Sequence, residues 1–559
     1  MTTHPDLSAG LTPARRGLEL ELPLDLPPEA AWFQRNLNGV TSADYGPPAV
    51  SSSCTFDGDF CSQDFLVVGD ETSGRYLLIG ALAAERSLTY LTLERRQGRF
   101  TRVILRQPDL HSEAVPEAIT IFEGNDPRDL ILDYARHVAD RAGLPPVRAE
   151  RTVVGYCSWY YYYSEFGSRD LEEVVSALAA KRADFPCRYV QIDDGYQSHH
   201  GDWLERHPNW HLTLAETASL IRSEGFEPGI WLMPFLATTA SRVFREHTDW
   251  FVKGTDGEPY VMRGWSPPPD HLWACLDASL PEVREHLAKT FRDLAAAGFT
   301  YFKLDGTGMS LPPVPRADPD ATPLSAFRAG LRAIREAVPE ALILGCGTPF
   351  LASLGLVDHV RVSPDTGSKW EAWGLPTETL AEPLPPNEPC NFGNPCLRNA
   401  LHYSLAKWWM ADRWFRIDPD ALMARDERTS LSAGEARMSV LSGILTGIAI
   451  TSDHPGRMSR DRLELLARAA KLRLRDARPL DWGAGRWPQI FTGQCEGQPA
   501  AAVFNDSDRS VEYRLDAMGL GADATEHLHP LGSVHEVLRL PPHDAALLIG
   551  QDAPGKIGS

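Results

Sequence analysis

The 559-residue sequence has no long apolar run, no excess of positive charge, and neither a low-complexity tract nor an internal repeat. No stretch approaches 18 consecutive apolar residues, and the opening MTTHPDLSAGLTPARRG lacks the apolar core of a secretory signal. The formal net charge of -20 opposes binding to nucleic acid, because that affinity comes from Lys and Arg on phosphates. These absences predict a cytoplasmic protein with no membrane or nucleic-acid partner; they leave its oligomeric state, monomer or homo-oligomer, open.

The cysteines also lack the number and spacing expected for a disulfide framework or a zinc site. Nine cysteines is an odd number, which argues against a disulfide framework in a long chain. The closest pairs, Cys54 with Cys61 and Cys390 with Cys396, have neither the CxxC spacing nor the neighbouring histidines of a zinc site. We therefore expect free buried thiols and no structural metal.

What the sequence does contain is a central series of alternating strand and helix patterns. Hydrophobic content of 43% and charged content of 23% are those of a globular protein, and the length predicts more than one domain. Eight short β-branched or aromatic runs alternate with amphipathic helical stretches, which favours a closed (β/α)8 barrel. The expected strands are 153–158, 188–193, 228–233, 300–305, 342–346, 359–363, 413–417 and 448–452.

The regions on either side of this series have a different pattern. Turn-rich alternating segments such as FLVVG, YLLIGAL and YLTLERR predict an N-terminal β-sandwich, and PAAAVFND and HEVLRLPPHDAALLIG predict a small C-terminal antiparallel β domain. The fold class is therefore multidomain α/β plus all-β. We place the three domains at residues 1–148, 149–476 and 477–559.

Polar and aromatic residues end nearly every expected barrel strand, which is where barrel enzymes have their active sites. Carboxylates accept hydrogen bonds from sugar hydroxyls, and aromatic rings stack on the apolar face of a pyranose, so this ring of residues suits a sugar. Taken singly, Trp231 and Cys346 are more often core residues, and Asp418 and Asp453 more often cap a helix. The ring consists of Trp159, Tyr160, Asp193, Asp194, Trp231, Lys303, Asp305, Cys346, Arg361, Asp365, Asp418 and Asp453.

Three short motifs in this ring carry most of the information. In FKLD, Lys303 and Asp305 project to the same side of a strand, so the ammonium favours an ionised carboxylate, although a plain ion pair is the simpler interpretation. In RVSPD, Asp365 follows Pro364 and is either a turn residue or a reactive carboxyl. The adjacent carboxylates in QIDDGY indicate ligand binding by at least one of them, since burying two unpaired charges is costly.

At QIDDGYQSHHGDW, PGIWLMPF, YFKLDGTG, ILGCGTP and RVSPDTGSKW the chain resembles glycoside hydrolase family 36, the clan D α-galactosidases, especially its compact bacterial members. RNALHY and WFRIDPDALMARDERTSL extend the resemblance, which covers roughly residues 150–475. It implies a retaining, exo-acting α-galactosidase for melibiose- or raffinose-type sugars that needs no metal or cofactor. Retention expects two carboxyls about 5 to 5.5 Å apart.

The resemblance also implies a role for each matching residue. Asp305 would be the nucleophile and Asp365 the general acid/base. Asp193 and Asp194 would hold the O4 and O6 hydroxyls of galactose, with Lys303 near O3 and O4. The remaining implied substrate contacts are Cys346 and Arg361 on the C2 side, Trp159, Tyr160 and Trp231 on the apolar wall, and Trp32 from the N-terminal domain.

Two positions depart from the commoner family pattern, and several rival functions stay open. Tyr196 stands where many relatives have Trp, and Gly306 where a larger apolar residue is frequent, which bears on pocket depth and leaving group. The rivals are an α-N-acetylgalactosaminidase, a galactosyl-transferring relative and a carbohydrate-binding barrel without catalysis. A metal-dependent amidohydrolase barrel would need an HxH motif on its first strand, and GYCSWY has none.

Overall fold

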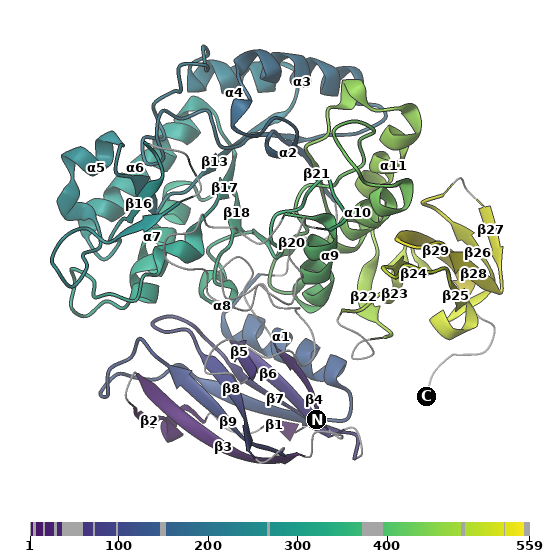
Figure 1. Ribbon diagram of the computed structural model, residues 1–559, viewed down its shortest axis with the longest axis horizontal. Coiled ribbons are helices and arrows are strands. Elements are labelled where there is room, and N and C mark those ends of the chain that lie inside the picture. Colours follow the sequence, from purple (N-terminus) through teal and green to yellow (C-terminus); the bar gives the residue numbers. More distant parts are fainter. Residues whose placement is uncertain are drawn as a thin grey trace.

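A computed structural model of the protein shows a central barrel with a β domain from each end of the chain beside it (Figure 1). It describes residues 2–3, 7–14, 17–26, 31–35, 60–70, 73–96, 99–145, 152–264, 266, 269–371, 395–481, 487–529 and 532–552.

The barrel is an eight-stranded sheet in which each described pair of neighbours is parallel. The two end strands approach each other at Leu422, whose N–H donates to the Ile450 carbonyl at 2.7 Å, so the sheet is nearly closed. In sheet order the strands are β20 (Arg416–Asp418), β19 (His359–Arg361), β18 (Leu342–Cys346), β17 (Tyr301–Leu304), β13 (Glu227–Leu232), β12 (Tyr189–Ile192), β11 (Val153–Cys157) and β21 (Ile448–Thr451).

Helices between these strands form where the sequence combines one apolar face with a clear start signal. Pro281 and Pro323 open two of them at the first turn, where a missing N–H costs little, and Gly298 ends the first with φ of 117°. The helices that follow barrel strands are α2 (Trp159–Tyr162), α3 (Ser168–Ala180), α4 (Leu214–Ser223), α6 (Pro281–Ala297), α7 (Pro323–Ala337), α8 (Phe350–Ser353), α9 (Leu397–Ala406), α10 (Ala433–Thr446) and α11 (Arg460–Lys471).

An excursion that the sequence patterns did not predict follows the third barrel strand. It contains a three-stranded antiparallel sheet and a short helix before the chain enters α6. Its elements are β14 (Leu236–Thr238), α5 (Arg242–Glu246), β15 (Val261–Arg263) and β16 (Leu272–Cys275).

The N-terminal region forms a sandwich of two five-stranded antiparallel sheets, as its alternating pattern predicts. The first sheet is ordered β1 (Thr2–Thr3), β10 (Ile119–Gly124), β7 (Arg75–Ala81), β6 (Phe65–Asp70) and β4 (Ala31–Arg35). The second is ordered β2 (Thr12–Pro13), β3 (Leu18–Leu26), β9 (Arg99–Gln107), β8 (Tyr90–Arg96) and β5 (Phe60–Gln63).

Strand β6 shows how this sandwich is joined to the barrel. Leu66 and Val68 belong to the sandwich core, whereas Phe65 and Val67, which alternate with them, belong to the large cluster that includes the barrel. Phe65 packs edge-on against Trp409 of the barrel domain at 5.2 Å between ring centroids. Helix α1 (Pro127–Arg141) lies against this face and connects the two domains.

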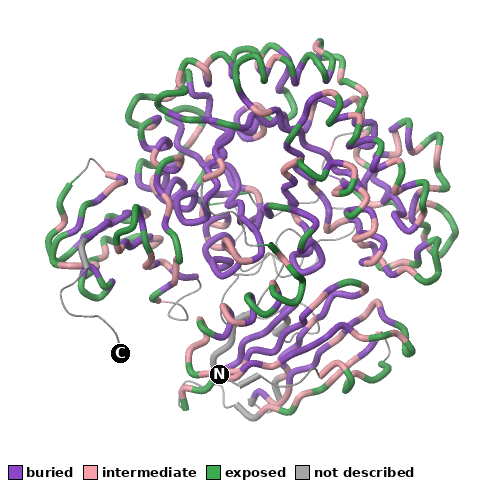
Figure 2. The backbone as a smooth tube through the Cα atoms, turned by 180° about the vertical axis from the view of Figure 1, so that it is seen from behind, coloured by how far each residue is buried: buried purple, intermediate pink, exposed green. Residues whose placement is uncertain are grey.

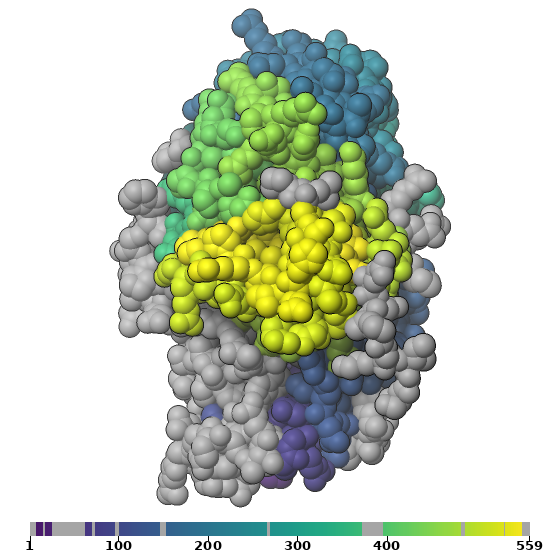
Figure 3. Space-filling view, turned by 90° about the vertical axis from the view of Figure 1, so that its right-hand side faces the viewer, coloured from purple at the N-terminus to yellow at the C-terminus, as the bar shows by residue number. Residues whose placement is uncertain are grey.

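The C-terminal β domain packs on the side of the barrel, where Figure 3 shows it in yellow. It pairs a six-stranded antiparallel sheet with a two-stranded one, and Arg437 of α10 holds it by two 2.8 Å bonds to Asp544. Its strands are β22 (Arg475–Pro479), β23 (Ile490–Cys495), β24 (Gln498–Asn505), β25 (Val511–Arg514), β26 (Leu520–Glu526), β27 (Gly532–His535), β28 (Val537–Leu540) and β29 (Asp544–Asp552).

The predicted barrel strands are confirmed with one shift. The seventh was expected at 413–417, but β20 begins at Arg416 because Asp412 takes a left-handed conformation, with φ of 59°, and turns the chain first.

The centre of the molecule is buried, as the purple segments of Figure 2 show. Among the described residues, no helix is both long and apolar enough to cross a membrane.

Candidate active site

The predicted site residues come together at the carboxyl ends of the barrel strands. Asp193 directly follows β12, Asp305 follows β17, and Arg361 ends β19. Because all these strands are parallel, their ends meet at one face of the barrel. The structure therefore brings these three residues to one face of the barrel.

Asp305 is a partly exposed carboxylate held at both oxygens. The Trp231 indole N–H donates to its Oδ2 at 3.0 Å, and the Gly306 backbone N–H donates to its Oδ1 at 2.7 Å. Burial raises the pKa of Asp305, but the Lys303 cation, the Arg361 cation and hydrogen bonds from Cys346 and Trp231 outweigh it. The resulting pKa lies below the ordinary carboxyl value, so Asp305 is ionised.

The backbone after Asp305 needs the glycine that the sequence has there. Gly306 adopts a left-handed conformation with φ of 61°, and a Cβ on it would lie 3.1 Å from the Met233 sulfur. The departure at Tyr196 also has a structural reason, since its buried hydroxyl donates to the Trp231 carbonyl at 3.2 Å. Gly306 therefore shapes the backbone after Asp305, and Tyr196 supports the strand of Trp231, which donates to Asp305.

Lys303 makes its ion pair with Asp193. Its ammonium lies 2.9 Å from Asp193 Oδ2, and both side chains are buried. Gln191 and Cys157 donate to the same oxygen at 2.6 and 3.3 Å. The expected effect of Lys303 on Asp305 is present as a charge interaction, while the hydrogen bond of Lys303 goes to Asp193 at the end of β12, two strands away in the sheet.

Asp194 is oriented by two donors from the loop that follows it. Gln197 Nε2 and His200 Nε2 lie 2.5 and 2.9 Å from its Oδ1. The His200 ring is itself enclosed by Trp203, Trp231 and Trp273, with centroids 5.6 to 5.9 Å away. Aromatic packing thus holds the His200 ring in place, and His200 in turn orients Asp194.

Asp365 lies beside Arg361 and is about a third exposed. Arg361 Nη1 is 2.8 Å from Asp365 Oδ1, and the Arg361 side chain is almost fully buried. Burial and the nearby carboxylates of Asp420 and Asp305 raise the pKa of Asp365, although Arg361 and Lys303 pull it down. The net pKa is above the ordinary value, which suits a group that must hold a proton.

The other predicted contacts occupy different positions. Cys346 is fully buried and hydrogen-bonded to Asp305, whereas Trp159 is partly exposed and packs edge-on against Tyr163. Tyr160, expected to shape an apolar wall, uses its hydroxyl as a donor to Asp420. Trp32 lies in β4 and pairs with Gly69 of β6, but its side chain lies outside the described residues.

Asp418 and Asp453 bind loop backbone, whereas their simpler interpretation predicted helix caps; the N-caps of the following α-helices are Ser432 and Ser459. Asp418 accepts the Asp420 N–H at 2.9 Å, and Asp453 accepts the Ala424 N–H at 2.6 Å. Burial raises the pKa of Asp418 to about 7 and that of Asp453 to about 6. Among the described residues, no group of His, Cys, Asp and Glu has a metal-binding arrangement.

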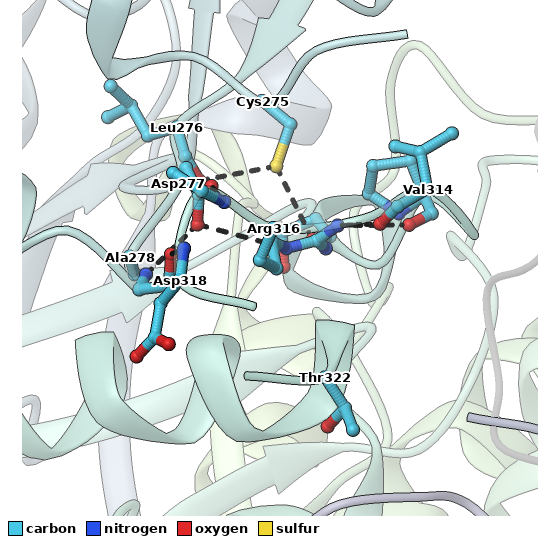
Figure 4. Close-up of polar contacts among 12 residues, drawn as sticks. Cys275, Leu276, Asp277, Ala278, Val314, Arg316, Asp318 and Thr322 are labelled. Carbon is cyan, nitrogen blue, oxygen red and sulfur yellow. Dashed lines mark hydrogen bonds and ion pairs between the residues drawn. The ribbon is translucent and has the colours of Figure 1, made fainter. Parts of the chain in front are cut away.

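The loop after Asp305 is fastened by a second buried arginine, Arg316, shown in Figure 4. Arg316 donates to the Pro312 and Val314 carbonyls at 3.2 and 2.7 Å and to the Ser310 carbonyl at 3.3 Å. Asp277 lies 4.0 Å from its guanidinium. This clamp connects the segment that carries Asp305 to the excursion after the third strand.

Comparisons with known proteins find similarity to α-galactosidases. Residues 116–326 match the Melibiase family model. Over 209 residues the chain is 23% identical to α-galactosidase AgaA of Geobacillus stearothermophilus, a match that covers 36% of this chain and 27% of that protein. The structure of TtGalA, an α-galactosidase of Thermus thermophilus in complex with p-nitrophenyl α-D-galactopyranoside, is similar with a TM-score of 0.67 and 27% identity, covering 88% of this chain and 95% of that one.

The chain is therefore similar to α-galactosidases, among them a member of glycoside hydrolase family 36. A galactosidase structure of AgaA with 1-deoxygalactonojirimycin, at 13% identity and a TM-score of 0.59, shares the fold over 95% of this chain and 77% of that one. The matched part of the curated relative is about a quarter of its length. Activity and substrates are therefore argued below from the site itself.

Sequence reasoning missed two residues of this site, His200 and Asp420. His200 stands within the quoted segment QIDDGYQSHHGDW, and Asp420 within the DPD of WFRIDPD. Neither is at a strand end, so the strand-end argument did not select them. The signal in each case was a polar residue in a motif that had already been matched.

Proposed function

We propose that this chain is a retaining exo-α-galactosidase that removes terminal α-D-galactosyl residues from small oligosaccharides of the melibiose and raffinose type. The observation that carries the proposal is the placement of two carboxyls in different surroundings within one cluster: Asp305 accepts from Trp231 and Gly306, and Asp365 lies 2.8 Å from Arg361. In keeping with these contacts, the pKa of Asp305 is lowered and that of Asp365 is raised. A nucleophile must be ionised and an acid must hold its proton, so the pair suits double displacement.

In the first step an Asp305 oxygen attacks the anomeric carbon C1. The bond from C1 to the leaving oxygen breaks, its electron pair stays on that oxygen, and Asp365 gives this oxygen its proton. The product is a galactosyl ester of Asp305. Trp231 and Gly306, which donate to the two carboxylate oxygens, hold Asp305 in position for the attack.

In the second step the same two carboxyls act in reverse roles. Asp365, now ionised, takes a proton from water, and the water oxygen attacks C1. The ester bond to Asp305 breaks and galactose leaves with its original anomeric configuration. Arg361, which lies 2.8 Å from Asp365, keeps the ionised form in place between the steps.

Sugar recognition is assigned to the charged and aromatic residues around these carboxyls. We assign the axial O4 and the O6 hydroxyl to Asp193 and Asp194, and O3 and O4 to Lys303. Cys346 and Arg361, both buried beside Asp305, are assigned to the C2 side, where they leave less room for an acetamido group. This crowding is the argument against an α-N-acetylgalactosaminidase. The presence of both carboxyls is the argument against a barrel that only binds sugar.

A panel of aryl α-glycosides tests the substrate assignment. The galactoside should be cleaved faster than the glucoside, because an equatorial O4 leaves a buried carboxylate unpaired at a cost of about 1 to 3 kcal/mol, or roughly 5- to 150-fold in rate. The N-acetylgalactosaminide should be cleaved least well. Equal rates for glucoside and galactoside would contradict the assignment of Asp193 and Asp194.

Azide rescue tests the two catalytic roles. In Asp305→Gly, azide attacks an activated aryl α-galactoside directly and gives β-galactosyl azide after one inversion. In Asp365→Gly the ester on Asp305 still forms, so azide gives α-galactosyl azide after two inversions. The α anomer from Asp305→Gly, or wild-type activity of either variant on unactivated galactosides, would overturn the roles.

The proposal extends to the setting of the enzyme. The net charge of -20 supports a free, uncharged galactoside as partner, without nucleic acid or membrane. Cytoplasmic location, action without a cofactor, and the domain limits 1–148, 149–476 and 477–559 stay predictions. A galactosyl-transferring activity would show in the same assays as products larger than the substrate.

A further inference from the structure

Asp420 is a buried carboxylate that reaches into the neighbourhood of Asp365 from the loop after β20. Its side chain is almost fully buried, and its backbone adopts a left-handed conformation with φ of 76°. This conformation is uncommon for a residue other than glycine, but aspartate tolerates it better than most. The loop thus accepts backbone strain at the position that delivers this carboxylate.

Three groups from two other segments, α2 and the stretch from Arg361 to Thr366, converge on one oxygen of Asp420. The Tyr160 hydroxyl donates to Oδ2, the Thr366 backbone N–H donates to it at 2.8 Å, and Arg361 Nη1 lies 3.5 Å away. The same Arg361 nitrogen is 2.8 Å from Asp365, and Thr366 is the next residue after Asp365. Asp420 therefore contacts two groups next to Asp365: the Arg361 cation that pairs with Asp365, and the backbone N–H of the following residue, Thr366.

We propose that Asp420 is a positioning residue for Asp365: it shares the Arg361 guanidinium with Asp365 and anchors the backbone at Thr366. This inference rests on the proposed function, because it concerns the step in which Asp365 gives a proton to the leaving group. Asp420 itself touches neither substrate nor the reacting atoms in this assignment. Its effect comes through Arg361 and Thr366.

The electrostatic consequence resolves a conflict within the site. An arginine 2.8 Å from a carboxyl favours the ionised carboxylate and would leave Asp365 without its proton at neutral pH. A second carboxylate on the same guanidinium counters this, and Asp420 is among the groups that raise the pKa of Asp365. The charged and titratable groups acting on Asp365 are Arg361, Lys303, Asp420 and Asp305, and those around Asp420 are Tyr160, Arg361, Asp418 and Asp365.

The test compares the pH dependence of kcat/KM in wild type and Asp420→Asn on a galactoside with a poor leaving group, such as methyl α-galactoside. Asn keeps the shape and an acceptor oxygen for Tyr160 and Thr366 and removes the charge, but its NH2 group cannot accept the Ala421 N–H that lies 2.7 Å from Oδ1. Arg361 then pairs with Asp365 alone and lowers its pKa. The basic limb of the pH profile, on which activity falls as Asp365 loses its proton, should therefore move to lower pH by about one unit. With each enzyme's kcat/KM expressed relative to its own optimum, the variant should be about tenfold slower than wild type at the same pH on that limb.

Three controls separate this effect from general damage. Asp420→Glu retains the charge and should keep the wild-type basic limb. Asp453→Asn removes another buried carboxylate, one that faces Arg425 at 3.8 Å, and should also leave the basic limb unchanged. A dinitrophenyl galactoside needs little acid assistance, so its basic limb should move less in Asp420→Asn than that of the methyl galactoside.

The outcomes distinguish the inference from the proposed function. A folded Asp420→Asn enzyme with the wild-type basic limb, or with a limb moved to higher pH, would overturn the role of Asp420. If wild type fails to cleave galactosides, or if Asp365→Asn keeps the limb, the proposed function itself is wrong. Should Asp420→Asn not fold, Asp420→Ser replaces it and the same shift is expected.

Discussion

Two buried arginines, Arg361 in the active site and Arg316 in the loop after Asp305, lie among similar groups but do different things. Arg361 has carboxylates at 2.8 and 3.5 Å, from Asp365 and Asp420. Arg316 gives its hydrogen bonds to backbone carbonyls, and its nearest carboxylate, Asp277, is 4.0 Å away. Both side chains are buried, with 3% and 6% exposed.

The pKa values of Arg361 and Arg316 differ because their contacts differ. Burial lowers the pKa of each arginine, but the Cys346 thiol, Asp365 and Asp420 raise that of Arg361 well above its ordinary value. For Arg316 burial dominates and its pKa is lowered. A guanidinium between two carboxylates sets their protonation, whereas one between carbonyls fastens a loop. The comparison teaches that the partners of a buried arginine, rather than its burial, indicate its role.

The matched change Arg361→Lys should have the largest effect, and on activity. Lysine keeps a charge but cannot span two carboxylates with a planar fork. We expect kcat/KM on an aryl α-galactoside to fall by roughly 100-fold, because charge stabilisation near the reacting carboxyls is lost. Steady-state kinetics checks this, with circular dichroism to confirm folding. A variant with wild-type kcat/KM would place Arg361 in the same class as Arg316.

Arg316→Lys should mainly affect stability. Lysine cannot satisfy the three carbonyls of Ser310, Pro312 and Val314 together, and each unsatisfied buried acceptor costs about 1 to 3 kcal/mol. We expect a lower thermal midpoint in calorimetry, with most of the activity per folded molecule retained at low temperature. A loss of activity as large as that of Arg361→Lys, without a lower midpoint, would break the comparison.

Asp277→Asn is the counterpart of Asp420→Asn in the second cluster. Asp277 accepts the backbone N–H groups of Ser279 and Ala317 at 3.0 and 2.7 Å, and an amide can replace only one of its two oxygens. We expect a loss of about 1 to 2 kcal/mol in the free energy of unfolding and an unchanged basic limb in the pH profile. Denaturant unfolding and the kcat/KM profile measure these two quantities. A moved limb would show that Asp277 also acts on the reacting carboxyls.

The smallest expected effect is that of Asp109→Asn. Burial raises the pKa of Asp109 to about 6, although Arg316 and a hydrogen bond with Ser87 oppose it. The folded protein therefore binds this proton more tightly than the unfolded chain, and stability from this group is lost as pH rises from about 4 to about 6. Above pH 6 the variant should equal or exceed wild type by up to about 1 kcal/mol, since Asp109 is still partly exposed. Thermal midpoints that differ most at pH 4 would contradict this sign.

The strand-end residues were predictable because they obey local rules. Alternation within FKLD places Lys303 and Asp305 on one side of a strand, and hydrophobic runs such as LILGC locate the strand that Cys346 ends. The residues that adjust them were harder to predict. The sequence does not state that Lys303 pairs with Asp193, 110 positions away, or that Tyr160 donates to Asp420, 260 positions away.

The sequence by itself determined the alternation of strands and helices, the β domains at both ends, and the carboxylates, cations and aromatic residues available at the barrel's active face. These follow from periodicity and residue chemistry, which act over a few positions. Only the tertiary structure decided which cation pairs with which carboxylate, and so which carboxyl holds a proton. Asp305 and Asp365 are chemically identical side chains, and their pKa values move in opposite directions because closing the barrel buries them among different neighbours.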